Sequence, residues 1–236
     1  MKTGWGVVVE NKIPKAGCKE CKDGYIRVYN DNGYRYKNKI CSCLVEWESL
    51  KYSRKLLEES NIPERPKKFF RLGNWEENDG MDFELLKSII ESEGEEENWL
   101  FLYGNAGTGK TYASIILAQI AIMKEMSVYF VNVTNLLDLL RPNMQDESQP
   151  QKVMKQCEKV DVLILDDIGH EKSSQWVRER LYRIINDRWN SGKITVFTSN
   201  FNIEHLKDTV SPAVYSRVKG ESLEVEMKSQ IDKRLK

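Results

Sequence analysis

Residues 104–111 read Gly-Asn-Ala-Gly-Thr-Gly-Lys-Thr and follow the apolar run Trp99–Tyr103. The stretch fits G-x-x-x-x-G-K-[ST], which binds nucleotide phosphates when a strand precedes it and a helix follows it. Glycines let successive backbone N–H groups turn inward around the phosphates, and the helix N-terminus adds a positive dipole end. Because the flanking pattern is right, we expect a phosphate loop rather than a glycine-rich turn that matches by chance. The expected phosphate-binding residues are Gly104, Asn105, Ala106, Gly107, Thr108, Gly109, Lys110 and Thr111.

Two carboxylates are placed to complete this chemistry. Asp166 and Asp167 end the apolar run Val162–Leu165, and carboxylates at the C-terminal end of a buried strand reach the edge where open α/β sheets bind ligands. We expect Asp166 to hold Mg²⁺ together with the Thr111 hydroxyl, and Asp167 to polarise the attacking water. Lys110 is expected to reach the β- and γ-phosphates. Asp-Asp-Ile-Gly is also turn chemistry, but the phosphate loop upstream favours the functional interpretation.

A short amide follows another apolar run, Ile194–Thr198, in the sequence Ser199-Asn200. At a strand end beside a nucleotide, Asn200 is suited to orient the water or to sense the γ-phosphate. The alternative is that Asn200 caps a helix or a turn. The two histidines, His170 and His205, have no ligand-like neighbours in the sequence and receive no predicted role.

Four of the five cysteines occur as two close pairs, C-x2-C and C-x-C, with 19 residues between the pairs. This spacing approximates that of zinc sites, although C-x-C departs from the usual second pair. Four thiolates with no open position make a structural site, which stabilises a region with little apolar content. The predicted zinc ligands are Cys18, Cys21, Cys41 and Cys43; Cys157 lies among apolar residues and is expected to be a buried small hydrophobe.

Strand-like and helix-like runs alternate after residue 98, which predicts an α/β fold with a parallel sheet. The expected strands are Trp99–Tyr103, Val128–Val133, Val162–Leu165, Ile194–Thr198 and, more weakly, Leu223–Val225. The expected helices are Thr111–Lys124, Asn135–Leu140, Gln151–Lys159 and Ser174–Trp189. Before them, a hairpin over Tyr25–Tyr29 and Tyr34–Ile40 and a helix over Leu44–Ser60 are expected.

Charge is balanced overall, with 36 basic and 36 acidic residues, but it is unevenly spread. Residues 1–72 carry a net charge of +7, residues 73–98 carry −9 and residues 99–236 carry +2. We therefore expect three parts: a zinc module at 1–70, an acidic linker at 71–97 and a nucleotide-binding domain at 98–236. No secretory signal or run long enough to cross a membrane is visible, so a cytoplasmic protein without a membrane partner is expected.

The ordered set of phosphate loop, Asp166-Asp167, Thr198-Ser199-Asn200 and Ser216-Arg217 resembles an AAA+ ATPase. More narrowly, residues 165–169 and 198–201 resemble bacterial replicative-helicase loaders of the DnaC/DnaI type, with the related transposition helper IstB sharing much of this core. The resemblance spans about residues 60–236. It implies that Asn200 is the sensor-1 residue and that Arg217 is an arginine finger acting in trans on a neighbouring subunit's nucleotide.

The same resemblance implies further partners. A DnaB-type helicase hexamer would bind the N-terminal zinc module, and Ser174 and Trp176 would contact single-stranded DNA; Trp176 also suits the apolar face of a core helix. The chain departs from the AAA+ pattern in two ways. Asp167 stands where Glu is commoner, which implies slow turnover. The 19 residues after Arg217 are too few for a full helical lid.

Together with the phosphate loop and the cysteine spacing, this resemblance implies an ATP-, Mg²⁺- and Zn²⁺-dependent helicase loader that acts in DNA replication, with ATP hydrolysis allowing its release. The alternatives are an IstB-like transposition helper, a P-loop kinase and an adaptor that binds ATP but barely hydrolyses it.

Overall fold

The computed structural model describes residues 25–29, 35–40, 42–63, 99–142, 146–171 and 174–228. The chain divides into two compact units, Met1–Glu58 and Glu59–Lys236. Within the described residues, none of the helices combines the length and the apolarity needed to cross a membrane. The domain boundaries expected at residues 70 and 97 lie outside the described residues and stay predictions.

The first unit contains an antiparallel hairpin and one long helix. Strand β1 (Tyr25–Tyr29) pairs with β2 (Arg35–Ile40), with a register shift at Val28/Tyr29. Helix α1 (Ser42–Glu59) follows. The expected hairpin and the expected helix are both present. The hairpin forms where short aromatic and β-branched runs flank Asn-Gly in the sequence, a pattern that favours a hairpin.

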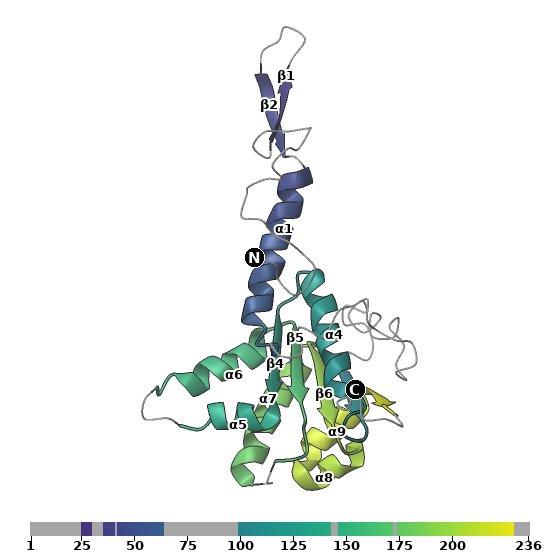
Figure 1. Ribbon diagram of the computed structural model, residues 1–236. Helices are drawn as coiled ribbons and strands as arrows, with labels where there is room; N and C mark the ends of the chain where they lie inside the picture. The colour runs from purple at the N-terminus through teal and green to yellow at the C-terminus, as the bar shows by residue number, and fades with distance from the viewer. Residues whose placement is uncertain are drawn as a thin grey trace. The chain divides into compact units, whose positions relative to one another are not determined.

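The second unit is built on a sheet of five parallel strands in the order β4-β5-β6-β3-β7 (Figure 1). Strand β6 lies between β3 and β5, so the ends of these three strands are neighbours although they are far apart in the sequence. The strands are β3 (Trp99–Tyr103), β4 (Val128–Asn132), β5 (Val162–Asp166), β6 (Ile194–Ser199) and β7 (Ser222–Glu226). The predicted parallel α/β sheet is confirmed.

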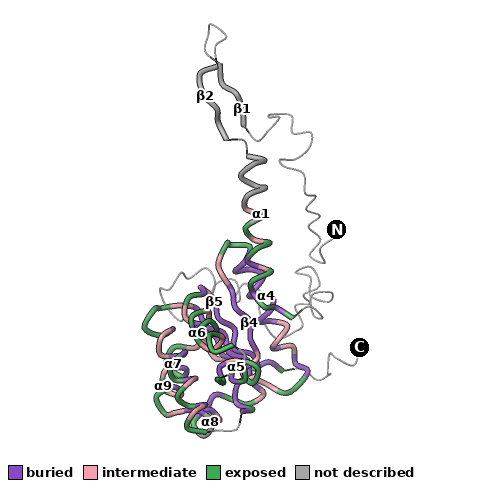
Figure 2. Tube along the Cα trace, turned by 90° about the vertical axis from the view of Figure 1, so that its left-hand side faces the viewer, coloured by how far each residue is buried: buried purple, intermediate pink, exposed green. Residues whose placement is uncertain are grey.

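Helices cover both faces of this sheet. Alternate strand residues such as Phe101, Leu163 and Phe197 join one apolar cluster with the helices of one face, while α4 packs against β4, β5 and β6. The central strands are therefore buried throughout, as Figure 2 shows by the purple trace inside this unit. The helices are α4 (Lys110–Met123), α5 (Val133–Leu139), α6 (Gln149–Lys159), α7 (Gln175–Asn190), the short η3 (Ile203–His205) and α8 (Leu206–Thr209), and α9 (Pro212–Glu221).

Helix α5 begins two residues before its predicted start. Asn132 ends β4 and its side-chain oxygen accepts hydrogen bonds from the backbone N–H groups of Thr134 and Asn135. An asparagine at this position satisfies the free N–H groups of the first helical turn. The helix therefore starts at Val133, which the apolar pattern assigned to the preceding strand.

Arg188 is fully buried near the end of α7 and holds the start of two strands. Its guanidinium donates to the carbonyl oxygens of Cys157 (2.8 Å), Val160 (3.0 Å), Asp161 (3.1 Å) and Ile194, and to the Thr195 hydroxyl (2.8 Å). Burial lowers the pKa of Arg188 to about 10. The side chain thus ties the end of α6 to the starts of β5 and β6.

Replacing Arg188 should destabilise the second unit strongly. Arg188→Leu leaves several buried carbonyl groups without donors, and each such group costs roughly 1–3 kcal/mol, so we expect a loss of at least about 3 kcal/mol in the free energy of unfolding. Urea denaturation measures it. The matched control is Arg183→Leu, since Arg183 is 58% exposed and its ion pairs with Glu158 and Asp187 are 3.7 and 3.8 Å long. Equal stability of the two variants would contradict this account.

Candidate nucleotide-binding site

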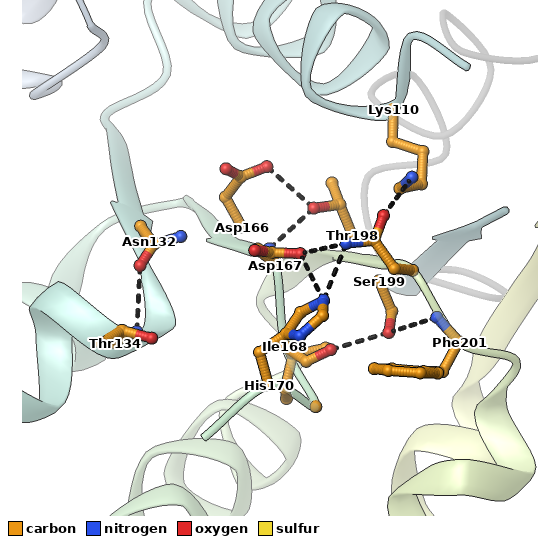
Figure 3. Close-up of polar contacts among 12 residues, drawn as sticks. Lys110, Asn132, Thr134, Asp166, Asp167, Ile168, His170, Thr198, Ser199 and Phe201 are labelled. Atoms are coloured by element: carbon orange, nitrogen blue, oxygen red, sulfur yellow. Dashed lines mark hydrogen bonds and ion pairs between the residues drawn. The ribbon is translucent and has the colours of Figure 1, made fainter. Parts of the chain in front are cut away.

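The predicted site residues meet at the carboxyl ends of three neighbouring strands. The phosphate loop follows β3, Asp166 ends β5 and Asp167 comes directly after it, and Asn200 follows β6. Since β6 pairs with β3 and with β5, residues separated by almost a hundred positions come into hydrogen-bond contact. Figure 3 shows the resulting polar network, with Lys110 pointing toward the loops that follow β5 and β6.

The loop backbone requires glycine at its first position. Gly104 has a φ of 146°, and a Cβ atom there would lie 2.3 Å from the carbonyl oxygen of Met227. Met227 in turn donates its N–H to the Tyr103 carbonyl at 2.7 Å. Gly109 adopts a left-handed conformation, φ 96°, as the N-cap of α4. These conformations are available to glycine without steric cost.

Lys110 is 7% exposed, and its ammonium lies among oxygens of the site. It donates to the carbonyls of Gly104 (2.7 Å) and Asn105 (2.8 Å) and to Oδ1 of Asn200 (2.8 Å). The lysine of the loop and the amide after β6 are therefore in direct contact, as a shared nucleotide site requires.

Asp166 is held by two hydroxyl groups from different elements. Thr111 at the start of α4 donates to Oδ1 of Asp166 at 2.9 Å, and Thr198 near the end of β6 donates to the same oxygen at 2.8 Å. The Thr198 hydroxyl also accepts the Asp167 N–H at 2.8 Å. A hydroxyl and a carboxylate at this separation are the oxygen ligands that Mg²⁺ prefers, so Thr111 and Asp166 fit the predicted ion.

Burial raises the pKa of the Asp166 carboxyl above its ordinary value, and the hydrogen bonds from Thr198 and Thr111 oppose that shift. The buried negative charge is therefore poorly solvated by the protein alone. A divalent cation bound at this carboxylate would favour its ionised form and reverse the effect.

Asp167 and Asn200 form the second half of the network. Asp167 has a φ of 63°, in the left-handed region that a short polar residue tolerates at a turn. Its Oδ1 accepts a hydrogen bond from Nδ2 of Asn200 at 3.0 Å. The predicted water-polarising carboxylate and the predicted sensor amide therefore touch each other.

His170, which received no role from the sequence, lies in this network. Its Nε2 is 2.7 Å from Nδ2 of Asn200 and 3.4 Å from Oδ1 of Asp167. The partner stands 30 positions away, so no local pattern could reveal the contact. Thr198 and Arg188 were missed for the same reason, since their partners are brought together by strand pairing.

Arg217 lies on α9 and contacts α7. Its guanidinium carbon is 5.3 Å from the ring centroid of Tyr182 and 5.1 Å from that of Trp189. Both rings are partly exposed, at 39% and 44%. The predicted role of Arg217 toward a neighbouring subunit's nucleotide is not tested by these contacts and stays a prediction.

The two predicted DNA-contact residues are at the start of α7. Ser174 is the N-cap, and its hydroxyl accepts the Val177 N–H at 3.2 Å. Trp176 is half-buried against the edge of the core, and the guanidinium carbons of Arg141 and Arg180 lie 5.7 and 5.8 Å from its ring centroid. Trp176 thus belongs partly to the core, while its ring also faces two cations.

Of the predicted zinc ligands, Cys18, Cys21 and Cys41 lie outside the described residues, and Cys43 lies in α1. No cluster of three or more potential metal ligands occurs among the residues that the structure describes, so the zinc site stays a prediction. Cys157 is buried as expected, and burial raises the pKa of its thiol to about 12.

A groove of about 840 Å³ lies elsewhere, beside β4. Its lining includes Asn132, Asn135, Arg141 and Gln149. The groove therefore adjoins the Arg141–Trp176 contact rather than the phosphate loop.

Comparisons with known proteins agree with this geometry. The chain is 34% identical to the replicative helicase loader DnaI of Bacillus subtilis over 109 residues, which are 46% of this chain and 35% of that protein. It is 23% identical to the loader DnaC of Escherichia coli K12 over 137 residues, 57% of this chain and 56% of that protein. A crystal structure of DnaI superposes with a TM-score of 0.55 at 26% identity, covering 66% of this chain and 90% of that one.

The two sequence matches cover only 35% of the length of DnaI and 56% of the length of DnaC. The family described as IstB-like ATP binding protein matches residues 30–228, which include the phosphate loop, both aspartates and Asn200. The chain therefore belongs to the IstB-like ATP-binding protein family, with homology to the DnaI and DnaC helicase loaders.

Proposed function

We propose that the chain is an ATP-driven loader that places a hexameric replicative DNA helicase on single-stranded DNA in the cytoplasm. The observation that carries the ATPase part is the continuous hydrogen-bonded path from Lys110 through Asn200 to Asp167. It places a cation for the phosphates, an amide and a carboxylate in one site. Homology to two replicative helicase loaders supports the choice of partner.

Each residue of the candidate nucleotide site has a separate role in the proposed hydrolysis of ATP. Lys110 exchanges the loop carbonyls and Asn200 for phosphate oxygens when ATP binds, and the loop N–H groups surround the phosphates. Thr111 and Asp166 would hold Mg²⁺, which would neutralise charge on the phosphates. Asp167 orients the attacking water, and Asn200 links that carboxylate to the γ-phosphate side of the site. Because Asp is one methylene shorter than Glu, the reaction is slow.

Arg217 completes this site from a second subunit in the proposed assembly. A planar guanidinium can stabilise the charge on a transferring phosphoryl group. Its guanidinium lies over the partly exposed rings of Tyr182 and Trp189, and this position near the surface supports a role at an interface between subunits.

The N-terminal unit is proposed to bind the helicase through a module that folds around Zn²⁺. The spacing of Cys18, Cys21, Cys41 and Cys43 supports this proposal, since a closed site of four thiolates stabilises a small module. The hairpin β1–β2 lies between the two cysteine pairs in the sequence.

Removing one predicted ligand should release both the metal and the helicase. We expect Cys43→Ser in the full chain to lose its zinc, measured by elemental analysis, and to lose capture of a DnaB-type hexamer in a pull-down. Cys157→Ala is the matched control, since Cys157 is a buried thiol of the other unit. A zinc-free chain that still captures the hexamer would contradict the proposal. A wild-type chain that contains zinc but does not bind the hexamer would instead favour a transposase as partner.

Single-stranded DNA is proposed to contact the start of α7. Arg141 and Arg180 lie over the ring of Trp176, and Arg141 also lines the neighbouring groove. Positive charge beside an aromatic ring is the combination that binds single strands without reading their sequence. The Ser174 hydroxyl, which caps α7, lies in the same exposed turn.

Loss of the aromatic ring should weaken DNA binding. Stacking contributes roughly 1–3 kcal/mol per base, so Trp176→Leu should lower the affinity for single-stranded DNA by about 5- to 150-fold, whereas Trp176→Phe should retain most of it. Fluorescence anisotropy at one fixed salt concentration measures both. Trp189→Leu, at another exposed tryptophan, is the control. Leu and Phe variants that bind equally would contradict the stacking proposal.

A further inference from the structure

Among the described residues, His170 is one of three whose side chains contact the Asn200 side chain. The Asn200 amide touches three groups: Nζ of Lys110 at 2.8 Å, Oδ1 of Asp167 at 3.0 Å and Nε2 of His170 at 2.7 Å. Figure 3 shows His170 close to Asp167, on the loop that follows β5. This histidine therefore reaches both residues that are proposed to handle the attacking water.

The partners fix the orientation of the amide. Lys110 has only donors, so the amide atom that faces its ammonium is the oxygen. The nitrogen then faces Asp167, whose carboxylate accepts the hydrogen bond. Two independent neighbours, a cation and an anion, thus demand the same orientation of Asn200.

The orientation of the amide in turn fixes the state of the histidine. The NH₂ group of Asn200 gives one hydrogen to Asp167 and has one left for His170. Nε2 of His170 must accept it, so this nitrogen carries no proton and the neutral ring carries its proton on Nδ1. A ring protonated on Nε2 could not accept this hydrogen, and its N–H would have only the longer contact with Oδ1 of Asp167, at 3.4 Å, in this network.

We propose that His170 is a positioning residue for ATP hydrolysis, which holds Asn200 between Lys110 and Asp167 by accepting a hydrogen bond at Nε2. The inference rests on the proposed ATPase function. When Lys110 turns to the phosphates, Asn200 loses one of its three contacts, and His170 and Asp167 then keep the amide in place. The rings of His170 and Phe201 are 5.0 Å apart, which limits the movement of the imidazole.

The tautomer can be measured without any turnover. A long-range ¹H–¹⁵N spectrum of the full chain distinguishes protonated from unprotonated ring nitrogens. The chain contains two histidines, so in the His205→Phe variant the only imidazole signals are those of His170. We expect Nε2 of His170 to be unprotonated and Nδ1 to be protonated at pH 8. The opposite tautomer would overturn the proposal, whatever the ATPase activity proves to be.

Turnover tests the positioning role. His170→Phe keeps a ring beside Phe201 but removes the acceptor, and we expect kcat to fall about ten-fold, the kinetic equivalent of one hydrogen bond, with KM for ATP nearly unchanged. His170→Gln places an acceptor oxygen near the former Nε2 and should restore most of kcat. The control His205→Phe, which changes the ring stacked 4.1 Å from that of Phe201, should behave like the wild type.

Two outcomes would overturn the positioning role: full activity of His170→Phe, or a Gln variant as slow as the Phe variant. The imidazole side chain is 41% exposed, so these substitutions leave the core intact. A wild-type chain without ATPase activity would instead disprove the proposed function, and the tautomer measurement would still decide the contact between His170 and Asn200.

Discussion

The buried carboxylate of Asp166 is the constraint on which the rest of the site depends. An ionised carboxylate taken out of water is unfavourable unless hydrogen bonds or a cation compensate for it. Here the compensating hydroxyls come from Thr111 on α4 and Thr198 on β6. The phosphate loop, β5 and β6 must therefore stay in one register, and that register also brings Lys110, Asn200 and Asp167 into contact.

The opposite end of the sheet is held by Arg188. Its guanidinium binds carbonyls at the end of α6 and at the starts of β5 and β6, so hydrogen bonds join the strand starts as well as the strand ends. The contacts of Arg188 thus lie at the amino ends of the strands, and the candidate nucleotide site lies at their carboxyl ends, where open α/β folds bind ligands.

The sequence predicted the parallel sheet and the phosphate loop, because buried strands read as apolar runs and the loop has a fixed spacing of glycines. It also identified Asp166, Asp167 and Asn200 as residues at strand ends. It missed α9, although Ser211 and Pro212 form a recognisable helix start there. It did not predict the contacts of His170 with Asn200, of Thr198 with Asp166 or of Arg188 with Cys157, since each joins segments about 30 positions apart.

The central claim is that these strand ends form one site that hydrolyses ATP. The most direct test is release of inorganic phosphate from Mg²⁺–ATP by the full chain, with single-stranded DNA present. The account predicts slow turnover, lost in Asp167→Asn by roughly a hundred-fold or more while ATP binding is retained. Turnover that is unchanged in Asp167→Asn, or transfer of the phosphate to an acceptor other than water, would contradict it.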